Sequence, residues 1–175
     1  MEYSQSLPPM QSALIEIRQH PAVMRVAAAL HAHGLADTIA VMPAAAHTAQ
    51  AAAEALGCKL EAIAKSIIFR AADGRAVLVV TSGKNRVDDQ KVAALIGEKI
   101  GKADAEFVRE QTGFAIGGVA PIAHLNPPLV LMDEHLLTLV EVWPAAGHPN
   151  TMFRIAPHDL LCISGARIAN IALGN

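Results

Sequence analysis

The sequence predicts a mixed α/β domain of the α+β kind, with helices around a mixed, largely antiparallel sheet. Apolar residues make up 53% of the 175 residues and aromatic residues only 3%, so the core must consist mainly of alanine, valine, isoleucine and leucine. Short apolar runs occur in neighbouring pairs, as in hairpins, and capped helical segments lie between them. We expect one domain over residues 1–175, which is long enough to bury a core.

The first half of the chain contains segments with clear ends. Pro21 is typical of a first helical turn and Gly34 of the position after a last one. Thr48 can cap a helix, and Gly57 can end it in the left-handed conformation. The pair Asp73-Gly74 separates two β-branched runs and predicts a hairpin. The expected elements are helices at Ser12–His20, Pro21–His33 and Thr48–Leu56, a strand at Thr38–Met42 stopped by Pro43, and hairpin strands at Lys65–Ala71 and Arg75–Thr81.

The second half has similar signals. Asp88 and Asp104 can each accept hydrogen bonds from the N–H groups of a first helical turn, and Pro157 suits the start of a helix. We expect helices at Asp88–Ile96, Asp104–Gln111 and Pro157–Ile163, strands at Pro128–Asp133, Thr138–Trp143 and Thr151–Ile155, and a turn at Ala145–Asn150.

The stretch FAIGGVAPIAH, Phe114–His124, interrupts this pattern with two adjacent glycines, a proline and no Asp, Glu, Lys or Arg. A strand would lose stability through Gly117 and Gly118, and Pro121 cannot donate a ladder hydrogen bond. The segment is therefore predicted to be a loop whose main-chain N–H groups approach a ligand closely. We call residues 114–124 the glycine loop.

Charge and hydropathy limit the partners. The formal net charge of −2 argues against a broad nucleic-acid-binding surface, so we expect no DNA partner. A small surface of this protein that binds one end of a nucleic acid is still compatible with this charge. Its candidate is Ser82–Lys91, where Lys84 and Arg86 could contact phosphates, although a solvated turn is the alternative.

No apolar run approaches the ~20 residues of a membrane span, so no membrane partner is expected. The start lacks a secretory pattern, and we expect a cytoplasmic protein.

Several kinds of chemistry have no motif in this chain. Cys58 and Cys162 form no CxxC pair, and the eight histidines include no HExxH, so we expect no metal and no other cofactor. A metal-dependent hydrolase that assembles its histidines from distant segments is a weaker alternative. The chain also lacks the GxSxG elbow of a serine hydrolase and the phosphate-binding P-loop.

Lys65 stands at the entry to the apolar run KSIIF. By itself it is explained by an ordinary lysine at a strand edge. Together with the glycine loop, it would supply a cation beside free backbone N–H donors. That combination suits a phosphate or a developing oxyanion.

Four segments carry a resemblance to a known family. AKSIIFR, SGKNRVDDQKVAALIG, EQTGFAIGGVAP and HDLLCISG follow one another in the order found in the YbaK/prolyl-tRNA-synthetase-associated editing domains. The resemblance covers about residues 22–168. It implies a YbaK-like fold and trans-editing, which is hydrolysis of the ester in a mischarged aminoacyl-tRNA, usually the tRNA for proline. The family implies no metal, and a positioned water assisted by a ribose hydroxyl of the tRNA.

The same resemblance implies roles for individual residues. Gly117 corresponds to the leading glycine of the family's GxxxP loop, which shapes the site around the scissile carbonyl, and Lys65 would engage the terminal adenosine or its phosphate. His148 and Asn150 are candidates for selecting the amino acid. The remaining substrate-binding candidates are the other loop positions, Gly118, Val119, Ala120 and Pro121.

The partners follow from this assignment. Lys84 and Arg86 are the candidates for binding the acceptor end of aminoacylated tRNA, either alone or with help from a prolyl-tRNA synthetase. A non-catalytic member of the same fold, which binds a tRNA end, a nucleotide or a protein, is the alternative function. The amino acid that is removed stays open, because pocket volume and not a motif decides it.

Overall fold

The computed structural model describes residues 8–42 and 46–174. A six-stranded sheet lies at the centre in the order β4-β2-β3-β5-β8, and β6 also pairs with β2. A separate antiparallel pair joins β1 to β7. The strands are β1 Ile39–Val41, β2 Ile63–Ala71, β3 Ala76–Ser82, β4 Ile100–Lys102, β5 Leu129–Asp133, β6 Trp143–Pro144, β7 Thr151–Phe153 and β8 Arg167–Ala169.

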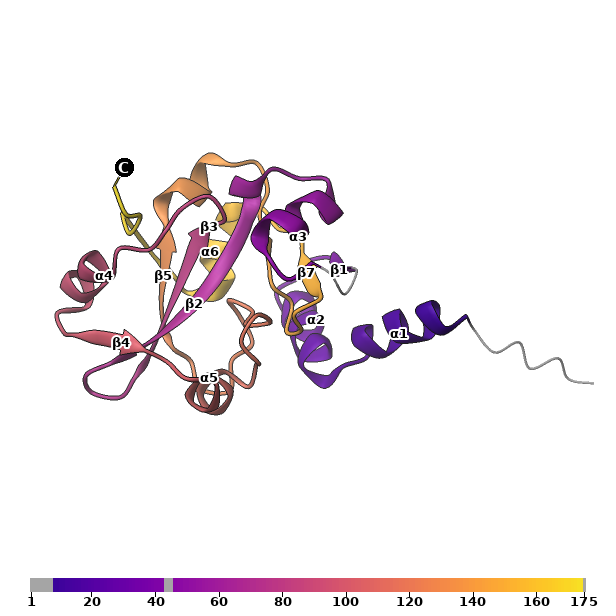
Figure 1. Ribbon diagram of the computed structural model, residues 1–175, viewed down its shortest axis with the longest axis horizontal. Helices are drawn as coiled ribbons and strands as arrows, with labels where there is room; N and C mark the ends of the chain where they lie inside the picture. The colour runs from indigo at the N-terminus through magenta and orange to yellow at the C-terminus, as the bar shows by residue number, and fades with distance from the viewer. Residues whose placement is uncertain (1–7, 43–45, 175) are drawn as a thin grey trace, which may run out of the picture.

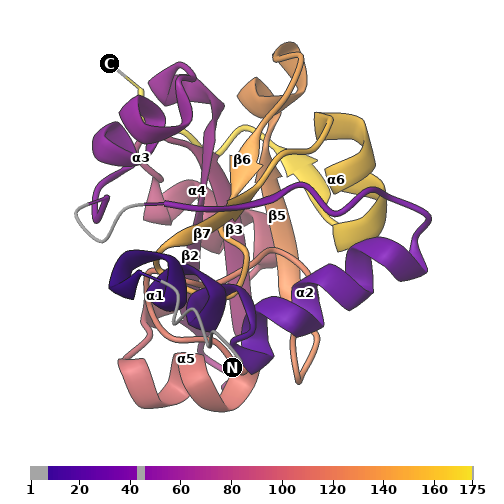
Figure 2. The same ribbon diagram turned by 90° about the vertical axis from the view of Figure 1, so that its right-hand side faces the viewer.

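Six α-helices surround these strands in the part of the chain that is described (Figure 1, Figure 2). They are α1 Pro9–Arg18, α2 Pro21–Ala32, α3 Ala49–Leu56, α4 Asp89–Ile96, α5 Ala105–Thr112 and α6 Pro157–Ser164, with 3-10 helices η1 Leu60–Ala62 and η2 Glu134–Thr138. α1 extends away from the sheet and buries none of its side chains (Figure 1). None of the helices in residues 8–42 and 46–174 is long and apolar enough to cross a membrane.

The predicted helix caps are confirmed. The side chain of Thr48 accepts a hydrogen bond from the Ala51 N–H, and that of Asp104 accepts one from the Phe107 N–H. Asp88 caps α4 in the same way. Gly57 ends α3 in the left-handed conformation, at φ +67°. These helix ends follow from local hydrogen bonds, which is why sequence alone predicts them.

The mixed α+β class is also confirmed, together with the hairpin of β2 and β3 around Asp73-Gly74. The sheet is less antiparallel than expected, however. β4 is antiparallel to β2, but β6 pairs with β2, β5 with β3 and β8 with β5 in parallel. A long connection leads into each parallel strand, and the direction of such a strand is set by tertiary contacts.

One predicted strand is wrong. Thr138–Trp143 does not form a strand: residues up to Thr138 belong to η2, and only Trp143 begins the short β6. Asp133 starts η2 by accepting a hydrogen bond from the His135 N–H. Val140 is 92% exposed although the run looked apolar. The three-residue strands β4 and β8 were not predicted, because they are too short for a detectable period. Pro43, the expected strand stop, lies outside the described residues.

The glycine loop is irregular, as predicted, and α2 holds both of its ends. The Nε of Arg25 donates a hydrogen bond to the Ala123 carbonyl at 2.8 Å, and an Nη of the same side chain donates to the Gly113 carbonyl at 3.2 Å. The guanidinium lies 4.5 Å from the centre of the Phe114 ring. Phe114 is 1% exposed, so the start of the loop is anchored in the core.

His124 closes the loop from its other end. Its Nε2 lies 2.7 Å from the Ala120 carbonyl, so this nitrogen carries the hydrogen and donates it. The His124 ring also packs edge-on against Phe114, with 5.9 Å between centroids. Burial lowers the pKa of His124, and the hydrogen bond to Ala120 opposes this shift in part.

Acidification should therefore weaken the fold through His124. Because its folded pKa lies below the unfolded value of ~6.5, the unfolded chain binds more protons between the two values. The free energy of unfolding should fall as the pH is lowered through that window and level off below the folded pKa. His124→Gln, which keeps an N–H donor, should flatten this dependence in denaturant titrations at a series of pH values. His158→Gln, on the exposed side of α6, is the control, and equal slopes in all three proteins would contradict the assignment.

Candidate functional site

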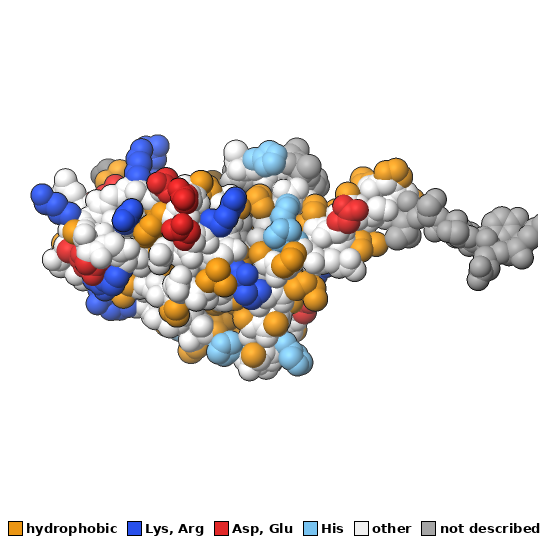
Figure 3. All heavy atoms as spheres, turned by 90° about the horizontal axis from the view of Figure 1, so that it is seen from below, with side chains coloured by type: hydrophobic (Ala, Val, Ile, Leu, Met, Phe, Trp, Pro, Cys, Tyr) orange, Lys and Arg blue, Asp and Glu red, His pale blue; other side chains and the backbone are white. Residues whose placement is uncertain are grey.

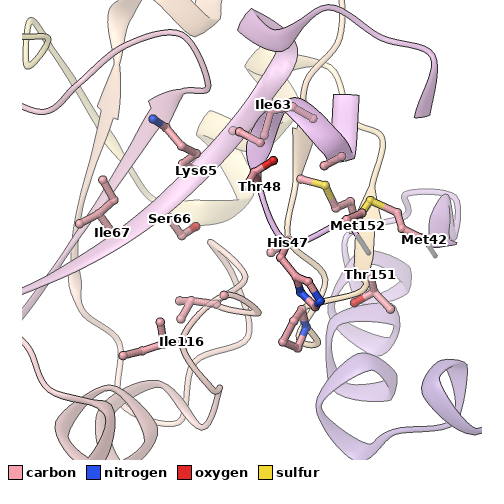
Figure 4. A pocket seen from close by; sticks show the side chains of 18 residues that line it. Met42, His47, Thr48, Ile63, Lys65, Ser66, Ile67, Ile116, Thr151 and Met152 are labelled. Carbon is pink, nitrogen blue, oxygen red and sulfur yellow. The ribbon is translucent and has the colours of Figure 1, made fainter. Parts of the chain in front are cut away.

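A pocket of about 560 Å³ lies between β2, the glycine loop, the start of α3 and β7 (Figure 4). One end is apolar and is lined by Met42, Ala52, Ile63 and Met152. The other end contains Lys65, Ser66, Ile67, Ile116, Gly117 and Val119. The pocket thus combines an apolar compartment with a polar one that faces bare backbone.

Gly117 lines the pocket from the glycine loop. It is exposed and has φ +87°, a conformation that side-chain-bearing residues rarely adopt. A Cβ at this position would lie 3.8 Å from the nearest atoms of Pro149, so space alone would allow it. Among the described residues, Gly117 and Val119 donate their N–H groups to no protein acceptor. These two groups can serve a ligand.

The other predicted loop residues support the wall from behind. The N–H of Gly118 is donated to the Ala115 carbonyl, and a Cβ on Gly118 would lie 2.8 Å from the carbonyl carbon of His148. Gly118 is therefore needed for close packing on the 145–150 turn. Ala120 and Pro121 are buried and do not line the pocket.

Lys65 contributes a fixed cation. Its Nζ donates to the Asn85 carbonyl at 2.8 Å, and Figure 4 shows this nitrogen directed away from the Met152 end of the pocket. The Asn85 side chain donates to the carboxylate of Asp133, which is 1% exposed and also accepts from Thr81. The turn that holds Lys65 is thereby tied to the core.

The charge of Lys65 is not neutralised by a carboxylate. Within residues 8–42 and 46–174, neither Lys65 nor Arg86 forms a salt bridge. Burial lowers the pKa of Lys65, and the nearby positive charge of Arg86 lowers it further. The two cations therefore repel each other, and an anion bound between them would relieve the repulsion.

Lys84 differs from Arg86, although the sequence suggested both for one patch. The Lys84 ammonium lies 2.9 Å from the Glu61 carboxylate, and this contact lowers the pKa of Glu61. Figure 3 shows Lys and Arg side chains interspersed with Asp and Glu on the face that it presents. Of Lys65, Lys84 and Arg86, the two without a carboxylate partner among the described residues are thus Lys65 and Arg86.

His148 and Asn150 stand behind the pocket. The His148 Nδ1 accepts a hydrogen bond from the Asn150 N–H at 3.1 Å, and the His148 ring lies against His20. Burial, followed by the neighbouring His20, lowers the pKa of His148. From this turn and the strand after it, the residues that line the pocket are Ala145, Pro149, Thr151 and Met152.

Sequence reasoning missed several lining residues. Met42, His47 and Met152 carry no motif, and Thr48 was noticed only as a helix cap. Ser66 offered one signal, a hydroxyl inside the apolar run KSIIF. Within the described part of the chain, no cluster of three or more His, Cys, Asp or Glu could hold a metal ion. The site therefore offers cations and backbone donors for an anionic or ester-containing ligand.

Known proteins are similar to this chain in sequence and in fold. Residues 43–163 match the family model described as the aminoacyl-tRNA editing domain. The uncharacterised protein YwhH of Bacillus subtilis is 34% identical over 121 residues, which are 69% of this chain and 77% of that protein. A proline–tRNA ligase of Limosilactobacillus fermentum is 31% identical over 102 residues, 55% of this chain. The matched region covers 18% of the ligase, so the similarity is to a small part of it.

The fold similarity extends over most of the chain. The crystal structure of a candidate trans-editing enzyme for prolyl tRNA synthetase matches with a TM-score of 0.84 and 42% identity. The match covers 88% of this chain and 98% of the other. The resemblance drawn from the four sequence segments is thereby confirmed. The chain belongs to the aminoacyl-tRNA editing domain family.

Proposed function

We propose that this protein is an aminoacyl-tRNA deacylase that removes a small non-cognate amino acid from mischarged tRNA, most readily from the tRNA for proline. The observation that carries this proposal is the placement of Lys65 and Gly117 in the wall of one pocket. The family, the proline–tRNA ligase relative and the structure described as a candidate trans-editing enzyme support it.

The geometry supports a division of labour within the pocket. The cations of Lys65 and Arg86 attract the phosphate of the terminal nucleotide. The free N–H groups of Gly117 and Val119 stabilise the oxyanion that forms when water attacks the ester carbonyl. A ribose hydroxyl of the tRNA assists that water, as the family resemblance implies. No step in this scheme requires a metal ion.

The apolar end of the pocket suits the side chain of the amino acid. Met42, Ile63 and Met152 offer it no charged group and no strong hydrogen-bond donor. A small uncharged side chain is therefore preferred, with a discrimination of ~1–3 kcal/mol for each methylene. We place this activity in a single domain in the cytoplasm, with the acceptor end of aminoacylated tRNA and a prolyl-tRNA synthetase as partners.

Removal of the Lys65 ammonium should reduce deacylation sharply. A hydrogen bond to a charged group contributes about 1.5–3 kcal/mol, so Lys65→Ala should slow hydrolysis of mischarged tRNA for proline roughly 10- to 100-fold. Thermal melting checks that the variant is folded. Lys99→Ala, at an exposed position far from the pocket wall, is the control and should hydrolyse normally. Full activity in folded Lys65→Ala would rule out the role given to this lysine.

A methyl group at Gly117 should damage catalysis more than stability. The φ of +87° would be strained by about 1 kcal/mol in an alanine, and the shift would move the N–H donors, whose loss costs ~10²–10³ in kcat in other acyl-transfer sites. Gly74→Ala is a matched control, because Gly74 has φ +88° in the hairpin turn and a Cβ added there would meet no atom within 4 Å. Both variants should lose similar stability in denaturant titrations, but only Gly117→Ala should lose turnover. If Gly117→Ala and Gly74→Ala have equal turnover, the glycine loop has only a structural role.

Arg86 and Lys84 should differ in tRNA capture. Arg86→Gln should raise KM more than it lowers kcat, because its charge is free to meet a phosphate before the reaction. Lys84→Gln should raise KM less, because Glu61 already neutralises that charge. Steady-state kinetics at two salt concentrations measure both effects. A larger KM change in Lys84→Gln would reverse the assignment.

Wild-type protein that binds mischarged tRNA without hydrolysing it would favour the non-catalytic alternative.

A further inference from the structure

Among residues 8–42 and 46–174, one stretch of β2 has no partner strand on its outer edge. β6 pairs with Ile63 and Ala64, and β4 pairs with Phe69–Ala71, so Lys65–Ile68 lies unpaired between them. Figure 1 shows β3 and β5 on one side of β2, and α3 and β7 on the other. Lys65, Ser66 and Ile67 all line the pocket. The unpaired edge therefore borders the pocket.

The direction of the backbone groups along β2 follows from two hydrogen bonds. The Gly83 N–H donates to the Ile63 carbonyl at 2.6 Å, and the Ala71 N–H donates to the Arg75 carbonyl at 2.9 Å. Ile63 and Ala71 thus direct their backbone groups toward the β3 side of the hairpin. Because this direction alternates along a strand, Ser66 directs its N–H and C=O toward the unpaired edge. Neither group has a hydrogen-bond partner among the described residues, since β6 pairs only with Ile63 and Ala64 and β4 only with Phe69–Ala71.

The side chain of Ser66 is unsatisfied as well. Its Oγ is buried and has no hydrogen-bond partner in the described structure. An unmade hydrogen bond of this kind costs roughly 1–3 kcal/mol, so a protein keeps one only where something else satisfies it. Figure 4 shows this oxygen on the side of β2 that faces Ile116. The backbone of this one residue in the pocket wall therefore presents a donor and an acceptor without partners, and its buried hydroxyl lies unsatisfied beside them.

The dimensions favour a small planar ligand over an added strand. The gap between β6 and β4 is only four residues long, below the most common strand length of about 5–6 residues, and both of its ends are closed by strands already paired with β2. The volume of about 560 Å³ lies within the ~300–1,000 Å³ of pockets for drug-sized ligands. It exceeds what a small amino acid needs. Ile67 and Ile116, the latter 58% exposed, add apolar surface on which a ring can lie.

We propose that the backbone of Ser66 binds the adenine base of the terminal nucleotide of the tRNA. The Ser66 N–H donates to the ring nitrogen N1, and the Ser66 carbonyl accepts from the exocyclic amino group. This inference rests on the proposed function and deepens it, because it places the nucleoside of the same substrate beside Lys65 and Arg86, which would hold its phosphate.

The base itself provides the test. Uniformly ¹⁵N-labelled protein is titrated with 5′-AMP and, separately, with 5′-IMP, which has the same ribose and phosphate but a donor at N1 and an acceptor at C6. AMP should shift the Ser66 amide resonance and bind at least about tenfold more tightly than IMP, since one bidentate base contact is worth ~1–3 kcal/mol of discrimination. Equal affinity for the two nucleotides, or AMP binding that leaves the Ser66 amide unmoved, would overturn the proposal.

Two variants separate the backbone from the side chain. Ser66→Ala keeps the N–H and C=O pair and should retain the preference for AMP. Ser66→Pro removes the N–H at a position where no ladder bond is lost, which edge strands tolerate, and should abolish the preference in a folded protein. Loss of the preference in Ser66→Ala, or its retention in Ser66→Pro, would contradict backbone recognition. Should Ser66→Pro not fold, the comparison of AMP with IMP still decides.

Deacylation of mischarged tRNA is measured with the same wild-type preparation. AMP selectivity at Ser66 without hydrolysis would leave the adenine site in place and refute the proposed function. Hydrolysis together with equal AMP and IMP affinities would refute the adenine site alone. An extended peptide is tested as a competitor for the same edge. If it binds more weakly than AMP, adenine remains the supported ligand. If it binds more tightly than AMP and shifts the Ser66 amide, the adenine proposal is overturned.

Discussion

The site depends on the hydrogen bonds by which Arg25 fixes the glycine loop. This one guanidinium reaches carbonyls at both ends of the loop, Gly113 and Ala123, and covers the Phe114 ring. Ala123 has a φ of +62°, which costs a residue with a side chain about 1–2 kcal/mol. A hydrogen bond from a charged donor contributes about 1.5–3 kcal/mol, enough to offset that strain. The loop can then present Gly117 to the pocket in one conformation.

A second constraint is electrostatic. Asp133 is buried, and it is stabilised by hydrogen bonds from Thr81, Asn85 and the His135 N–H. This network holds Asn85, whose carbonyl accepts a hydrogen bond from the Lys65 ammonium, and no carboxylate in the described part of the chain pairs with that lysine. Although the chain has a net charge of −2, the pocket therefore has local positive charge. Local arrangement, and not total charge, determines whether a tRNA end can be attracted here.

The two ends of the pocket can recognise different parts of a ligand. Met42, Ile63 and Met152 form the apolar end, where size and shape discriminate, although His47, Thr48 and Thr151 also line the pocket near them. Around Ser66 and Gly117, unpaired backbone groups offer fixed hydrogen-bond directions, which can recognise a base or an oxyanion. Backbone recognition requires no particular side chain, so the Ser66 groups leave no clear pattern in the sequence, whereas adjacent glycines indicated the loop that contains Gly117.

Local interactions were predictable from the sequence, and contacts between distant segments were not. Thr48, Asp104 and Gly57 act on their own helix ends, and Asp73-Gly74 acts within one hairpin, so each could be predicted from its neighbours. The irregular loop at residues 114–124 was predicted from its own glycines and proline, and the order of four segments was enough to indicate the family. Tertiary structure alone decided that β5, β6 and β8 pair in parallel, that Thr138–Trp143 is no strand, and that Glu61 neutralises Lys84. It also placed Ser66 at an unpaired edge and His148 behind the pocket, because such positions depend on which remote segment packs alongside, and no short window of sequence contains that partner.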